Sequence, residues 1–174
     1  MENVLVNDIS KLDLSATDEH GPDSHQLCDI EPPPSGARRT RRIYYYGWVI
    51  PPAFLLEYAS LPRVTLLSYS DGLKRLRKMS GYKHLHWVNG YVADGKDLPH
   101  MEVGMEGRKV SDLLIVTASF IGKKTDKRLY DRRPTVAQMA KLIELFHGEK
   151  PSWHMDGQPK DFVHEYALLM DLDD

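Results

Sequence analysis

Six basic residues lie within eleven consecutive positions, and their chemistry is the easiest in the chain to interpret. They are Lys123, Lys124, Lys127, Arg128, Arg132 and Arg133. Cations held this close repel one another unless an anionic group lies near them. We therefore expect residues 122–133 to form an anion-binding connector between two elements. Its occupant would be the acidic tail of the same chain or an external polyanionic partner, either a protein or a nucleic acid.

The net charge of −2 hides a division of charge along the chain. Residues 1–36 hold eight acidic residues and one lysine, which gives a net charge of −7, and residues 134–174 have a net charge of −5. Between them, residues 37–133 have a net charge of +10. A basic middle with acidic ends favours an acidic partner. The same division is explained equally well if the blocks neutralise one another inside the fold, or if the excess charge is simply solvated.

Two histidines have a spacing that could serve a metal ion. His84 and His86 are two positions apart, so on a strand both imidazoles lie on one face. A zinc or iron site needs a third ligand, which His100 or Glu102 could supply. Nothing in the sequence fixes their approach, and histidine-rich strands often face solvent. We therefore predict no metal and no cofactor, and keep a small enzyme or metal-dependent protein using His84 and His86 as the second alternative.

Motifs for other chemistries are absent from the sequence. It contains no Gly-x-Ser-x-Gly turn, no phosphate-binding loop and no dinucleotide-binding glycine pattern. Cys28 is the single cysteine, so no intramolecular disulfide can form and a reducing compartment, cytoplasmic or nuclear, is expected. No apolar run is long enough to span a bilayer and no secretory signal is visible, so no membrane association is expected.

Nucleic-acid binding is the first alternative, and it depends on aromatic residues inside the basic block. Basic side chains contact phosphates, and aromatic rings stack on bases. The chain lacks the glycine–aromatic signature of RNA-recognition motifs, and the same aromatic residues would also suit a core. The aromatic residues concerned are Tyr44, Tyr46, Trp48, Trp87 and Tyr91.

The apolar run over residues 113–121 is rich in β-branched side chains, which is typical of a strand buried on both faces. We expect it at the centre of a sheet. A helix over 136–147 should lie across it, because Thr135 and Gln138 have capping-box spacing and Gly148 ends the pattern. Other expected elements are strands over 43–50, 84–92 and 100–106, helices over 52–60 and 71–80, and a last helix after Pro159.

This order of elements predicts the α+β class. We expect a small, mostly antiparallel sheet covered by three to four helices, in a layout that resembles a split βαβ unit. Residues 1–41 are predicted to be a disordered acidic tail followed by a proline-rich and arginine-rich linker, and residues 42–174 a single domain. Because no motif fixes a chemistry, the sequence favours an intracellular, non-enzymatic binding or regulatory module with a basic central surface.

Overall fold

The structure of the chain, a computed structural model, describes residues 25–34, 42–61, 64–92, 97–103, 107–119 and 123–157. Within these ranges the chain forms an antiparallel sheet and four helices, so the predicted α+β class is confirmed. The predicted helix after Pro159 lies outside the described residues, as do residues 1–24 and 35–41 of the predicted tail and linker.

Four strands form the main path of the sheet in the order β2-β4-β1-β5. Their bounds are His86–Val92 for β2, Lys109–Ser119 for β4, Tyr44–Ile50 for β1 and Ser152–Met155 for β5. The two-residue strand β3, Glu102–Val103, pairs with the start of β4. Strand β4 has partners on both sides, and its side chains from Leu113 to Ala118 are buried, as expected for the central strand.

The connections form two interlocked split βαβ units. Strands β1 and β2 both run antiparallel to β4, which lies between them, so they are parallel to each other. The same reasoning makes β4 and β5 parallel, with β1 between them. Each pair is joined through helices, and the order matches a ferredoxin-like layout with a short extra strand. This layout alone does not indicate a function.

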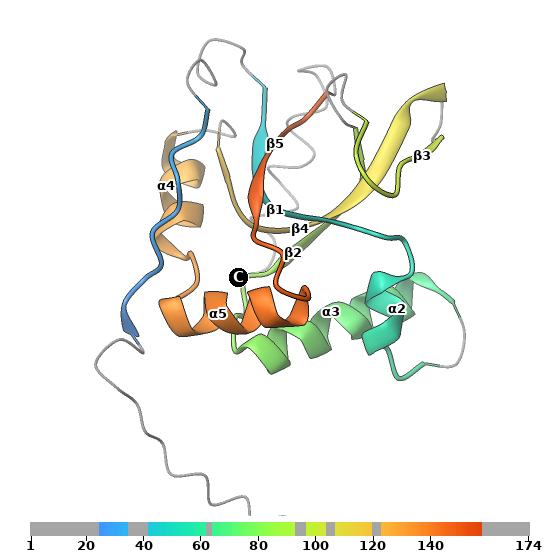
Figure 1. The fold of residues 1–174 in the computed structure, drawn as a ribbon, viewed down its shortest axis with the longest axis horizontal. Coiled ribbons are helices and arrows are strands. Elements are labelled where there is room, and N and C mark those ends of the chain that lie inside the picture. Colours follow the sequence, from blue (N-terminus) through green and yellow to red (C-terminus); the bar gives the residue numbers. More distant parts are fainter. Residues whose placement is uncertain are drawn as a thin grey trace, which may run out of the picture.

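Helices cover one face of the sheet. Helix α2 is Phe54–Tyr58, α3 is Leu66–Ser80 and α5 is Val136–Leu145. Figure 1 shows α3 and α5 side by side beneath the strands, with α4 (Lys123–Asp131) standing apart. Side chains from all three covering helices and from β1, β2 and β4 form the larger core cluster.

The aromatic residues of this larger cluster are packed against one another. The ring of Trp48 stacks on Phe146 with 4.2 Å between centroids, and Phe54 stacks on Phe146 at 5.0 Å. The indole N–H of Trp48 donates to the carbonyl of Glu149 at 2.8 Å, which satisfies its one polar atom. The face of β1 that carries Tyr46 and Trp48 is therefore part of the hydrophobic core.

The second face of the sheet carries its own buried cluster. Tyr45, Val88, Tyr91 and Leu113 belong to it, and Leu129 of α4 packs into it. Tyr44, Tyr46, Trp48 and Tyr91 are all buried, and only Trp87 of the aromatic residues considered for base stacking is partly exposed. Those four are therefore core residues and form no open stacking platform.

Two glycines permit close approach between backbones. A Cβ on Gly47 would lie 2.0 Å from the carbonyl oxygen of Leu114, where β1 and β4 are out of simple register. A Cβ on Gly72 would lie 1.9 Å from the carbonyl oxygen of Leu55, where α3 crosses α2. Any other residue at these positions would force the two elements apart.

The structure differs from the sequence predictions at several elements. Helix α3 begins at Leu66, because Thr65 and Ser68 form a reciprocal capping box, rather than at residues 70–71. Residues 123–131, expected as a connector, form the helix α4. Residues 152–155, for which no element was expected from the sequence, form the edge strand β5. In α5, Leu142 is fully buried, whereas Val136 and Ala140 are exposed.

Candidate anion-binding pocket

A pocket of about 370 Å³, here called the basic pocket, lies where α3 and α4 end and α5 begins. Four of its residues carry basic or titratable nitrogen groups: Lys83 and His84 from the segment after α3, and Arg132 and Arg133 from the segment after α4. One carboxylate, Asp131, also lines it. With neutral histidine, these lining residues have a net charge of +2.

Residues 25–34 form part of the wall of this pocket. Leu27 lines it and forms an isolated antiparallel bridge with Thr135. The amide of Cys28 donates to the carbonyl of Pro134 at 2.9 Å, and the amide of Val136 donates to the carbonyl of Gln26 at 2.8 Å. The segment therefore supplies an acceptor to one of the unpaired amides at the start of α5.

This packing differs from the expectation that residues 1–41 are a disordered tail. Cys28 and Ile30 are buried in the larger core cluster, with exposures of 6% and 7%. The indole N–H of Trp153 donates to the carbonyl of Glu31 at 2.8 Å. Residues 25–34 thus belong to the fold, because backbone hydrogen bonds and two apolar side chains hold them there. In Figure 1 the segment runs beside α4.

Arg133 connects this segment to the end of α4. Its Nε donates to the carbonyl of Cys28 at 2.8 Å, and its Nη1 donates to the carbonyl of Tyr130 at 3.0 Å. Its guanidinium also lies over the Tyr130 ring, 4.1 Å from the centroid. Arg133 therefore has a structural role, and its charge is held at the rim of the pocket in a fixed position.

Tyr82 forms the buried floor of the pocket. Its hydroxyl donates to the carbonyl of Val116 at 2.9 Å, and its ring makes an edge contact with His84. Burial raises the pKa of Tyr82, while the nearby charges of Arg132 and Arg77 oppose the shift. Because burial dominates, Tyr82 is neutral at ordinary pH and leaves the positive charge of the pocket undiminished.

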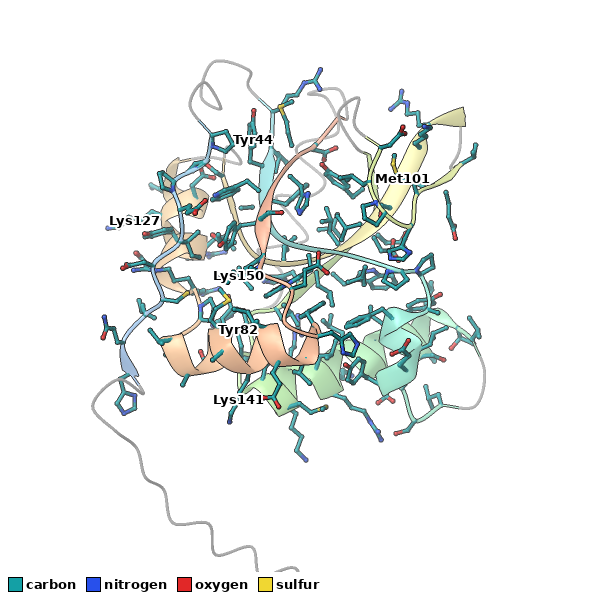
Figure 2. The ribbon with its side chains drawn as sticks, in the orientation of Figure 1. Tyr44, Tyr82, Met101, Lys127, Lys141 and Lys150 are labelled. Carbon is teal, nitrogen blue, oxygen red and sulfur yellow. The ribbon has the colours of Figure 1, made fainter. Side chains whose placement is uncertain are left out.

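The six cations predicted to bind an anion do not lie together at one site. Arg132 and Arg133 line the basic pocket. Lys124 and Lys127 lie on the exposed side of α4, as Figure 2 shows for Lys127, and Arg128 is half-buried. The Lys123 side chain lies outside the described part of the structure. Cations near the C-terminus of α4 also suit the helix dipole, which explains part of the cluster without any ligand.

Sequence reasoning missed Lys83 and His84 as partners of these arginines. Lys83 is an isolated lysine next to a core tyrosine, and His84 was considered only as a metal ligand. Gly81 has a φ of 69° and turns the chain sharply at the end of α3, which brings both residues to the pocket. The sequence indicates that a helix ends at Gly81, but it does not indicate in which direction the chain continues after that residue.

The histidine cluster considered from the sequence is divided in the structure. His84 lines the basic pocket, whereas His100 and Glu102 line a different pocket. Among the described residues, no group of three His, Cys, Asp or Glu side chains could hold a metal ion. A shared site of His84 and His86 with His100 or Glu102 is therefore not formed by the described residues.

Two polar side chains in the lining of the basic pocket already have hydrogen-bond partners within the fold. The hydroxyl of Thr135 accepts from the amide of Gln138 in the capping box of α5. The Gln138 side chain donates to the carbonyl of Gly81 at 2.6 Å and ties α5 to α3. No nucleophile paired with a base is present among the described lining residues. What they can do is hold an anionic group.

Comparison with known proteins adds no relative. No family model, no curated protein and no solved structure matches this chain. In the parts of the chain that the structure describes, no helix is long and apolar enough to cross a membrane.

Proposed function

We propose that this chain is a non-enzymatic binding or regulatory module that holds an anionic side chain of an acidic protein segment in the basic pocket. The observation that carries the proposal is the convergence of Lys83, Arg132 and Arg133 on one hollow from two separate parts of the chain. Charges gathered in this way attract an oppositely charged group and speed its association.

An acidic protein segment suits the site better than a polynucleotide. Binding of a single strand usually needs aromatic rings that are open to stacking as well as basic residues. Here Tyr45 and Tyr91 are buried on the face of the sheet that α3 and α5 leave uncovered, with exposures of 0% and 2%. At about 370 Å³, the basic pocket has room for an acidic side chain. Nucleic-acid binding remains as the second candidate, supported only by charge.

The compartment is part of the same proposal. We place the module in the cytoplasm or nucleus because its one cysteine, Cys28, is a buried free thiol. Burial raises the pKa of that thiol, with Arg133 opposing the shift, so the thiol is not activated. Cys28 is thus expected to act as a core residue.

The test measures affinity for two probes, a glutamate-rich peptide and a single-stranded oligonucleotide of equal charge. The variants are Lys83→Ala, which removes an exposed cation of the pocket, and Lys141→Ala, a matched control on the exposed side of α5. We expect Lys83→Ala to weaken peptide binding about threefold to tenfold, and Lys141→Ala to change it less than about twofold. Binding should also weaken as salt is added.

Each outcome has a defined meaning. Equal losses for both variants would show that the peptide is held by net charge alone, and would overturn the pocket as the site. Stronger binding of the oligonucleotide than of the peptide, lost in Lys83→Ala, would favour the nucleic-acid candidate. Melting temperatures of both variants are needed, because a loss of fold would weaken every probe alike.

A further inference from the structure

A second pocket, here called the acidic pocket, lies beside β2, β3 and β4 and shares no lining residue with the basic pocket. Its volume is about 210 Å³. Trp87 and Asn89 of β2 line it, as do Glu102 of β3 and Asp112 of β4. It is below the range of pockets that enclose a drug-sized ligand, so it suits one side chain rather than a whole small molecule. Met101, beside Glu102, marks this region in Figure 2.

One wall of the acidic pocket is flat and aromatic. The rings of Trp87 and Tyr69 are stacked, with 5.0 Å between centroids and 12° between planes. The indole N–H of Trp87 is buried and has no hydrogen-bond partner among the described residues. Buried donors without an acceptor are rare in folded proteins. Because this atom has almost no accessible surface, a ligand in the pocket would meet the ring of Trp87 and not its N–H.

The other wall is acidic. Glu102 and Asp112 line the pocket, and no lysine or arginine is among its described lining residues. Asp112 already takes part in an interaction within the chain, so the exposed Glu102 is the carboxylate offered to a ligand. His100 lines the same pocket, and among the described residues no group of three such side chains could hold a metal ion. A carboxylate beside aromatic rings suits an organic cation, whose charge is spread over several atoms.

We propose that the acidic pocket binds the guanidinium of an arginine side chain carried by a peptide segment. A guanidinium is planar, stacks on aromatic rings and donates to carboxylates through several N–H groups, so it matches both walls. The aliphatic stem of an arginine side chain also packs along aromatic surface, which a free guanidinium ion cannot do.

The experiment titrates the full chain with three probes: N-acetyl-arginine amide, the corresponding citrulline amide, and guanidinium ion alone. Binding is followed by the indole N–H signal of Trp87 in NMR spectra, assigned with Trp87→Phe. We expect saturable binding of the arginine amide, in the millimolar range typical of a single side chain, with a shift of that signal. The neutral citrulline amide should bind at least about tenfold more weakly, and guanidinium ion should also bind more weakly because it lacks the aliphatic stem.

Glu102→Gln tests the acidic wall on an exposed strand, where loss of fold is not expected. It should weaken the arginine amide about threefold to tenfold. Asp97→Asn is the matched control, because Asp97 is an exposed carboxylate nearby that pairs with Lys109 and does not line the pocket. Equal affinity for the arginine and citrulline amides, equal effects of the two variants, or no saturable binding would each overturn the proposal. None of these results depends on the basic pocket.

Discussion

The basic and acidic pockets are held together by different contacts. Different substitutions are therefore expected to disrupt each of them. The basic pocket joins residues after two helices to the segment 25–34, and it is held by backbone hydrogen bonds and by Arg133. The acidic pocket is built mostly from side chains on three paired strands, whose positions the sheet ladder fixes. The first therefore depends on the docking of one segment, and the second on the sheet and on the packing of α3.

The largest effect is expected where α3 meets α2, close to the acidic pocket. A side chain at Gly72 would collide with the carbonyl of Leu55, so Gly72→Val should destabilise the fold by about 3 kcal/mol or more. Chemical denaturation measures this loss. Lys74→Ala, on the exposed side of the same helix, should change stability by less than about 0.5 kcal/mol. A stable Gly72→Val protein would mean that the two helices are not in close contact.

The second prediction concerns the segment that closes the basic pocket. Ile30→Ala should cost about 2–4 kcal/mol, because Ile30 is buried in the larger core cluster. Glu31→Ala should cost little, because the contribution of Glu31 is its backbone carbonyl, which accepts from Trp153. Denaturation of both variants checks the difference, with peptide affinity as a second measurement. Equal stabilities would show that residues 25–34 are not docked.

The third prediction is that the stability of the fold falls at alkaline pH because of Tyr82, which forms the floor of the basic pocket. Burial raises the pKa of Tyr82 above its ordinary value of 10.0. The unfolded chain then loses this proton near pH 10 while the folded chain keeps it, so stability is fully present below pH 10 and falls as pH rises further. Each proton contributes a slope of up to about 1.4 kcal/mol per pH unit.

Tyr82→Phe removes this proton and should make the fall above pH 10 shallower. A residual slope is expected, because burial also raises the pKa values of Tyr46 and Cys28. Denaturation midpoints of both proteins at pH 9 to 11 give the comparison. The same slope in the variant would show that the Tyr82 hydroxyl is solvated in the folded state.

The smallest expected effect is a lack of coupling between the pockets. Lys83→Ala should leave affinity for the arginine amide unchanged within about twofold, and Glu102→Gln should do the same for the acidic peptide. This expectation holds because the two residues line different pockets that share no lining residue. A reciprocal change of more than about fivefold would show that the two sites share one equilibrium.

The elements predicted correctly are those whose side chains carry a periodic apolar signal. Strand β4 was visible as a β-branched run, and the start of α5 as a capping box. Helix α4 was missed because it is mostly charged, with Leu129 the one buried side chain among those that the structure describes. The edge strand β5 has four residues and no β-branched side chain, so propensity could not detect it.

The candidate pockets were harder to predict than the secondary structure. They are formed by a register shift, by backbone hydrogen bonds and by a turn, and none of these produces a periodic pattern of side chains. The register of β2 against β4 shifts between Val88 and Tyr91, and Tyr91 therefore lies on the face opposite to the one that simple alternation assigns. Residues 25–34 dock mainly through backbone groups, which every sequence possesses. The side-chain signal in this segment is weak: Cys28 and Ile30 are two positions apart, the spacing of two residues on one face of an extended segment. Charge clustering found two of the cations of the basic pocket, and the turn at Gly81 supplied the third.

The docking of residues 25–34 also sets an order of events during protein synthesis. Cys28 meets Arg133 across a separation of 105 residues, and Glu31 meets Trp153 across 122. At roughly 5–20 residues per second, the segment leaves the ribosome roughly 5 to 25 seconds before its partners do. During that interval Ile30 has no core to enter, so the segment is open to chaperones and proteases. The basic pocket is therefore among the last features of the molecule to form.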